Sequence, residues 1–258
     1  MKIKVRKFFR TLKIGKGLKL FVIGILAFGI VGGAFLSFRK AEPTNGNVKE
    51  NKKVAVLTFD DGPSKSTEKI LDILDEHDIK ACFFVIGAGK EKGQEIIKEI
   101  HSRGHLVCPH SFSHKYEEIY SSSEAYMKDF EEICDYIEEA TGELPKIFRF
   151  PGGSKNSLGV KNGVMNEIKK KTKEKGFSYL DWNVVSGDDT PTVYPPERLL
   201  ENIKKDLKKA KSPAVILFHD TYHNKTTPEA TELCIKHLEE LGYTFKRADE
   251  IDLEVKFK

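Results

Sequence analysis

The 258-residue sequence contains little cysteine, and its four cysteines form no C-x-x-C pair and no zinc-ribbon spacing. This scarcity excludes a disulfide-dense miniprotein and gives no sign of a structural zinc module. Glycine and proline are also few, at 20 and 10 residues, which excludes collagen and low-complexity disorder. Hydrophobic residues make up 39% of the chain, so we expect a folded domain with a sizeable core.

Basic charge is concentrated at one end of the chain. The formal net charge is +4, but residues 1–40 contain ten Lys or Arg and no acidic residue. The remainder has 33 basic and 39 acidic residues, a net charge of about −6. A domain of that sign lacks the broad basic surface that neutralises phosphates, so we expect no nucleic-acid partner.

An uncharged apolar stretch, residues 20–38, follows a basic segment, residues 1–19. Its 19 residues at about 1.5 Å each match a hydrocarbon core of roughly 30 Å, so the stretch can span a bilayer. The basic flank would stay cytoplasmic, and the rest of the chain would lie outside the cell. The basic segment carries eight cations, which a buried core helix would not follow: Lys2, Lys4, Arg6, Lys7, Arg10, Lys13, Lys16 and Lys19.

A cleaved signal peptide, leaving a secreted protein, is the alternative for this N-terminus. A signal peptide normally has an apolar core of about 7 to 15 residues, followed by a small-x-small cleavage site. Gly32 and Ala34 form a weak pair of this kind, but the length of the stretch favours a retained, single-pass anchor. Residues 39–53 are polar and aperiodic, which indicates a linker. A domain over residues 54–258 follows.

Within this domain, short apolar runs alternate with helix-length amphipathic segments. The runs predict seven strands, at 54–59, 82–87, 105–108, 147–150, 177–182, 214–219 and 243–246. The amphipathic segments predict six helices, at 67–76, 93–102, 123–140, 164–175, 196–210 and 228–241. Ser123 and Gly142 mark the two ends of the third helix. This alternation predicts an α/β fold with a parallel sheet, either a barrel or an open doubly wound sheet.

Two of the four cysteines, Cys82 and Cys108, lie at the ends of apolar runs and are candidate neighbours in the sheet. An external location would permit a disulfide. We favour the simpler interpretation that the cysteines are small, buried apolar residues.

Polar residues gather where the predicted strands end, which is where both parallel architectures place their active sites. Asp60 and Asp61 end the first strand, and His110 and His114 follow the third. An Asp pair alone would indicate an ordinary turn. Two histidines and one carboxylate, however, leave a coordination position open, as in a catalytic zinc site. Such a metal activates water, so hydrolysis is the expected chemistry.

Later strand ends add Arg149, Asp181 and His219. An Arg and an Asp at these positions can orient the acid and base groups, and His219 can protonate a leaving group. The two-His, one-carboxylate set also suits non-haem iron and oxygen chemistry. That alternative leaves Asp60, Arg149 and His219 without a role.

Four motifs occur in order: TFDDGP at 58–63, HSFSH at 110–114, RFPGG at 149–153 and LFH at 217–219. Over about residues 54–250 the chain therefore resembles the polysaccharide deacetylase family, also called the NodB-homology or carbohydrate esterase family 4 domain. The first two motifs are the most specific. The resemblance implies a distorted (β/α)7 barrel of parallel strands.

The resemblance also implies a role for each matching residue. Asp60 would be the general base, held in its charged form by Arg149, and His219 would be the general acid. The resemblance implies three ligands for a divalent metal, usually Zn²⁺, with Co²⁺ or another divalent ion as the alternative: Asp61, His110 and His114. It implies four substrate-binding residues, of which Trp182 and Leu217 wall the acetyl pocket: Pro151, Gly152, Trp182 and Leu217.

The chain departs from the family pattern at three places. Gly152 stands where an aromatic residue is common, so we expect a more open groove wall, and its backbone N–H is a candidate oxyanion donor. Asp188 and Asp189 replace an Asp-Trp pair. The acid that orients His219 is therefore Asp181 or Asp188, and we favour Asp181 because it ends a strand. Cys108 lies close to the first histidine, but the three other ligands already suffice.

These expectations combine into a membrane-tethered, metal-dependent deacetylase of N-acetylglucosamine-type sugars, with peptidoglycan as the first substrate expected. Exported poly-N-acetylglucosamine, chitin oligomers and O-acetyl xylan esters are the alternative substrates, because the same machinery cleaves them. A catalytically silent glycan-binding protein is the more remote alternative.

Overall fold

A computed structural model describes residues 53–87 and 90–251 of the chain. The predicted basic segment, anchor and nearly all of the linker lie outside these residues. Within the described ranges, no helix is long and apolar enough to cross a membrane.

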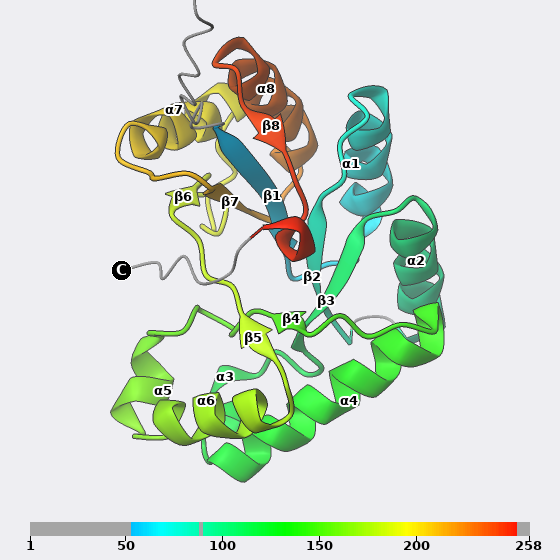
Figure 1. Ribbon diagram of the computed structural model, residues 1–258, viewed down its shortest axis with the longest axis vertical. Coiled ribbons are helices and arrows are strands. Elements are labelled where there is room, and N and C mark those ends of the chain that lie inside the picture. The colour runs from blue at the N-terminus through cyan, green and yellow to red at the C-terminus, as the bar shows by residue number, and fades with distance from the viewer. Residues whose placement is uncertain (1–52, 88–89, 252–258) are drawn as a thin grey trace, which may run out of the picture. The chain divides into compact units, whose positions relative to one another are not determined.

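The main sheet is parallel throughout and has the strand order β3-β2-β1-β7-β6 (Figure 1). Its strands are β1 (Val54–Asp60), β2 (Cys82–Ile86), β3 (Leu106–Ser111), β6 (Val184–Val185) and β7 (Ala214–His219). A sixth strand, β8 (Thr244–Phe245), pairs with the first two residues of β1. β2 pairs with β1 only from Thr58 to Asp60. β2 and β8 therefore pair with different parts of the same edge of β1.

A second, two-stranded parallel sheet contains β4 (Ile147–Phe148) and β5 (Ser178–Tyr179). The backbone N–H of Arg149, just after β4, donates to the carbonyl of Pro109 in β3 at 3.1 Å. The predicted α/β class with parallel strands is thus confirmed. The seven predicted strands are present, and β6 was not predicted. They form two sheets in a barrel-like arrangement rather than one continuous sheet.

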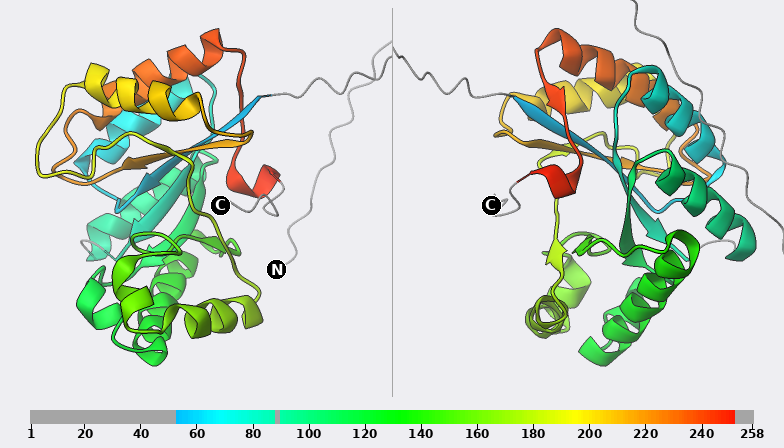
Figure 2. Two further views of the ribbon diagram at one scale, coloured as in Figure 1. Left: turned by 90° about the vertical axis from the view of Figure 1, so that its left-hand side faces the viewer. Right: turned by 45° about the vertical axis from the view of Figure 1, so that its right-hand side comes forward.

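Eight α-helices occur in the described ranges: α1 (Lys65–Glu76), α2 (Lys90–Ser102), α3 (Tyr116–Ile119), α4 (Ser123–Thr141), α5 (Ser157–Lys161), α6 (Met165–Glu174), α7 (Pro196–Leu207) and α8 (Thr227–Glu240). All six predicted helices are among them, and only the short α3 and α5 were missed. Figures 1 and 2 show α1, α2, α7 and α8 along the outside of the main sheet, with β4 and β5 on its other side.

Local sequence explains where the long helix α4 begins and ends. The Ser122 hydroxyl accepts the N–H of Ala125, so Ser122 is the N-cap and the predicted cap, Ser123, is the first helical residue. At the other end, Gly142 adopts a left-handed φ of 73°, which glycine tolerates at low cost.

Both faces of the central strands are buried, as expected when helices cover one face and a barrel interior the other. Leu57, Phe59 and Phe218 pack outward against the helices. Alternate residues point inward, where Cys82 and Cys108 pack with Ile147 and Leu180. All four cysteines are free and buried, which confirms their interpretation as small apolar residues.

An aromatic cluster packs α4 against the smaller sheet. The Phe130 ring lies 5.0 Å from the ring of Phe148 and 4.9 Å from that of Phe177, measured between centroids, and both pairs are edge-on. Phe130 is 1% exposed. Because interiors are close-packed, this residue fixes α4 against β4.

We predict that Phe130→Ala lowers the free energy of unfolding by about 3 to 5 kcal/mol, because it leaves a cavity between α4 and β4. Urea unfolding of the purified protein measures this value. Tyr222→Ala is the control, since Tyr222 is 65% exposed and its loss should change stability by less than about 0.5 kcal/mol. Equal stability losses in the two variants would contradict the assignment of Phe130 to the core.

Candidate active site

A cleft of about 800 Å³ opens at the carboxyl ends of β1, β3 and β7. Parallel α/β folds bind ligands at this edge, where the loops after the strands converge. The predicted site residues that line it are Asp60, Asp61, His110, Gly152, Trp182, Leu217 and His219. The sequence therefore located the cleft, and Trp182 and Leu217, which were expected to wall an acetyl pocket, both line it.

The three predicted metal ligands converge on one point. Oδ1 of Asp61 lies 3.3 Å from Nε2 of His110 and 3.1 Å from Nε2 of His114. The three ligand atoms all lie within 4.8 Å of one another. Cys108 is buried in the barrel interior and does not belong to this group.

The two adjacent acids face different partners because the backbone turns sharply between them. Asp60 is the last residue of β1, whereas Asp61 has a φ of 69° in the left-handed region. Asp60 points to Arg149, and Asp61 points to the two histidines. The predicted division between a base and a ligand thus has a structural basis.

The cluster fits a divalent cation. Nδ1 of His110 lies 2.8 Å from the carbonyl of Arg149 and donates to it, so Nε2 keeps its lone pair for a metal. Oδ1 of Asp61 is buried and accepts no well-directed hydrogen bond among the described residues. Burial raises the pKa of Asp61, but its interactions with His110 and His114 hold that pKa well below its ordinary value. An ionised oxygen and two imidazole nitrogens are suitable ligands for zinc.

Asp60 forms a buried ion pair with Arg149. Nη1 of Arg149 lies 2.8 Å from Oδ1 of Asp60 and 2.8 Å from the hydroxyl of Thr58. The Arg149 Nε donates to the carbonyl of Leu180 at 2.8 Å, and Nη2 donates to that of Asp181 at 3.2 Å. Arg149 is 0% exposed, so these partners compensate for the loss of its hydration.

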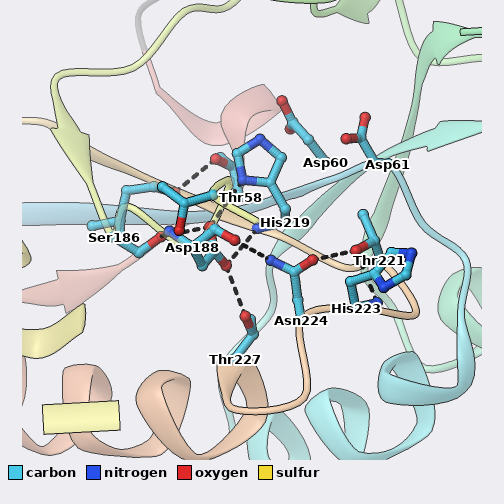
Figure 3. A network of polar contacts seen from close by, with 12 residues as sticks. Thr58, Asp60, Asp61, Ser186, Asp188, His219, Thr221, His223, Asn224 and Thr227 are labelled. Atoms are coloured by element: carbon cyan, nitrogen blue, oxygen red, sulfur yellow. Dashed lines mark hydrogen bonds and ion pairs between the residues drawn. The ribbon is translucent and has the colours of Figure 1, made fainter. Parts of the chain in front are cut away.

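His219 is oriented by Asp188. Figure 3 shows the carboxylate of Asp188 beside the His219 ring, with Asn224 and Thr227 below it in the view. Nδ1 of His219 lies 2.9 Å from one Asp188 oxygen, and the His219 backbone N–H donates to the other at 2.9 Å. The Thr227 hydroxyl donates to Asp188 at 2.7 Å, and the side-chain amide of Asn224 donates to its carbonyl at 2.6 Å.

This pair changes the protonation of the histidine. Burial lowers the pKa of His219, but the hydrogen bond and charge of Asp188 outweigh it and raise the pKa to about 9. His219 is therefore protonated at neutral pH and can donate from Nε2. The stabilisation that the Asp188–His219 ion pair provides is present below the pKa of His219 and is lost as the pH rises through that pKa.

The prediction that Asp181 orients His219 is wrong. The Asp181 carboxylate instead accepts the Ser154 backbone N–H at 2.9 Å and the Ser154 hydroxyl at 2.5 Å. Asp181 does end a strand-like segment, but that segment belongs to the smaller sheet, whereas Asp188 follows β6 beside β7. The sequence offered both acids, and only strand pairing distinguishes them.

Two expectations about the RFPGG motif also change. Pro151 is buried and its carbonyl accepts a hydrogen bond from the Tyr120 hydroxyl at 2.8 Å, so it supports the loop and does not line the cleft. Gly152 does line the cleft, but the Tyr116 ring fills the space beside it, 3.1 Å from where a Cβ would sit. The groove wall is therefore closed by Tyr116, a residue that the sequence did not single out.

A carboxylate paired with an arginine, a histidine paired with a carboxylate and a candidate metal-ligand cluster lie together at one edge of a parallel α/β domain, and metal-dependent hydrolases use groups of these kinds. The comparisons with known proteins give the family. The chain belongs to the polysaccharide deacetylase family, whose model matches residues 47–171.

Two relatives and one solved structure illustrate this membership. A peptidoglycan-N-acetylglucosamine deacetylase from Bacillus cereus is 34% identical over 217 residues, covering 83% of this chain and 76% of that protein. A peptidoglycan-N-acetylmuramic acid deacetylase from Bacillus subtilis is 29% identical, covering 81% and 74%. The catalytic domain of a peptidoglycan N-acetylglucosamine deacetylase from Eubacterium rectale superimposes with a TM-score of 0.73 at 35% identity, covering 81% of this chain and 93% of that one.

We predict that Asp188→Asn lowers the pKa of His219 from about 9 by about 1 to 3 pH units, because it removes the adjacent negative charge. The imidazole signal that disappears in His219→Gln can be followed by NMR through a pH titration. Asp181→Asn is the matched control and should leave the titration of His219 in place. A His219 pKa that stays unchanged in Asp188→Asn would contradict the assigned pair.

Proposed function

We propose that this protein is a membrane-anchored hydrolase that removes N-acetyl groups from N-acetylglucosamine residues of peptidoglycan, using a divalent metal ion. The observation that carries this proposal is the convergence of Asp60, the three-ligand cluster and His219 on one cleft. The family membership and the two peptidoglycan N-acetylglucosamine deacetylases above support the same reaction.

Hydrolysis of an amide requires an attacking water, a stabilised oxyanion and a proton for the departing nitrogen. Asp60 is the base: its Oδ1 is held by Arg149, and the carboxylate lines the cleft. Arg149 compensates the negative charge of Asp60 and fixes its orientation. Asp60 can therefore accept the proton of a water beside the ligand cluster.

His219, across the cleft, donates the proton to the departing nitrogen. Asp188 holds its Nδ1, which directs Nε2 toward the substrate and keeps the ring protonated. This is the arrangement in which one carboxylate orients a catalytic imidazole. Acid and base are thus separate groups with separate partners.

Asp61, His110 and His114 would hold the metal, Zn²⁺ as the first expectation. A bound divalent ion polarises the acyl oxygen and makes a nearby water more acidic. Trp182 and Leu217 lie in the same cleft and would receive the acetyl methyl group. The strand arrangement supports the distorted (β/α)7 barrel that the family resemblance implies.

The predicted anchor and the length of the linker limit which glycans the domain can reach. Residues 39–53 reach no more than roughly 50 Å when fully extended, so a domain anchored through residues 20–38 would meet nearby cell-wall glycan. Removing an acetyl group leaves an amine that is cationic near neutral pH. The proposed effect is therefore a change in wall charge on the outer side of the membrane.

We predict that the protein releases acetate from N-acetylglucosamine oligomers and from peptidoglycan, and that Asp60→Asn lowers the rate by about 10²- to 10⁴-fold. A chelator should abolish release, and added Zn²⁺ or Co²⁺ should restore it. The control is Asp135→Asn, since Asp135 is exposed on α4. A wild-type rate in Asp60→Asn would contradict its role as the base. Acetate released only from acetylated xylan would show that the substrate is an ester and not an amide.

We also predict that the intact chain sediments with membranes and resists an alkaline carbonate wash, because residues 20–38 span the bilayer. The measurement is cell fractionation, followed by determination of the N-terminal residue. Protein recovered from the medium with an N-terminus just after Ala34 would establish the cleaved, secreted form instead.

A further inference from the structure

The loop that carries the second histidine is held by a carboxylate from another element. Asp129, on α4, accepts three hydrogen bonds from this loop. The Ser111 hydroxyl donates to its Oδ2 at 2.5 Å, the Phe112 N–H donates to the same oxygen at 2.8 Å, and the Ser113 N–H donates to Oδ1 at 2.8 Å. One carboxylate thus accepts hydrogen bonds from three consecutive residues that lie between the two metal-binding histidines.

The contact continues from Ser111 to His114. The Ser111 hydroxyl, which donates to Asp129, accepts the backbone N–H of His114 at 2.9 Å. His114 has a φ of 54°, in the left-handed region that non-glycine residues seldom adopt. Such a conformation persists only when surrounding contacts enforce it. The chain from Asp129 through Ser111 to His114 supplies such contacts.

The position of Asp129 on α4 makes it a rigid support. Its helical neighbours Met127 and Phe130 are buried, and α4 packs directly against β3 (Figure 1). Asp129 itself is half-buried, so its hydrogen bonds are partly shielded from water. The loop is also fixed on its carbonyl side, where the Gly87 N–H lies 3.3 Å from the Ser111 carbonyl and 3.0 Å from that of Phe112.

We propose that Asp129 is a positioning residue of the metal site, which holds His110 and His114 at the spacing that a divalent ion requires. This inference rests on the metal site of the proposed function. Asp129 touches neither the ion nor the substrate. It acts through the loop, and the quantity it controls is the affinity for the metal.

The experiment compares Zn²⁺ dissociation constants, measured by chelator competition on the detergent-solubilised full chain. Asp129→Ala should weaken binding by about 10- to 100-fold, as is typical when a partner that orients metal ligands is removed. Asp129→Asn keeps the shape and one acceptor oxygen, so its loss should be smaller. Ser111→Ala should act in the same direction. The double variant should lose less than the product of the two single losses, because both act on one hydrogen-bond chain.

Asp135→Asn is the matched control, because Asp135 is exposed on the same helix, and its Zn²⁺ affinity should equal that of the wild type. The Co²⁺ absorption spectrum should change in Asp129→Ala and not in the control. A folded Asp129→Ala that binds Zn²⁺ within twofold of the wild type would overturn the inference. If that variant does not fold without metal, Asp129→Asn is decisive, and unchanged affinity there would overturn it.

Metal binding is measured without substrate, so the two proposals can fail separately. Absence of acetate release from every glycan, together with weaker Zn²⁺ binding in Asp129→Ala, would overturn the proposed activity and support the positioning role.

Discussion

The rest of the site depends on the hydrogen bonds and the ion pair of the buried Arg149 guanidinium. It joins Asp60 at the end of β1 to the carbonyls of Leu180 and Asp181 that follow β5, and so links the two sheets across the barrel interior. Its own backbone carbonyl accepts Nδ1 of His110. A fully buried charge needs complete compensation, so the contacts that stabilise the guanidinium also orient Asp60, while the Arg149 backbone orients His110.

The charged groups of the cleft fall into two ion pairs and one three-residue cluster. Asp60 is compensated by Arg149, Asp188 by His219, and Asp61 by two imidazoles in a geometry suited to a cation. These partners leave Asp60, His219 and the three-residue cluster at one cleft, as the proposed hydrolysis requires.

Much of this arrangement could be predicted from the sequence. The period of apolar residues gave the helices and strands, and the motifs at strand ends identified Asp60, Asp61, His110, His114, Arg149 and His219. The choice of Asp181 failed because it rested on the position of Asp181 at the end of an apolar run, whereas the pairing of β6 with β7 brings Asp188 to His219. Tyr116 and Asp129 were not found because no local pattern marks a side chain that reaches a site from a different element.

The sequence by itself determined the class of fold, the cleft edge and the types of reactive group, because periodicity and strand-end position are local properties of the chain. Tertiary structure alone decided the partners that no motif specified, such as Asp188 for His219 and Asp129 for the loop after His110. Two-residue strands such as β4, β5 and β6 carry too little pattern to fix their neighbours. The hydrogen bonds from Arg149 to Asp60, from Asp188 to His219 and from Asp129 to Ser111 join residues 89, 31 and 18 positions apart. Such contacts exist only after the strands have paired and α4 has packed against β3.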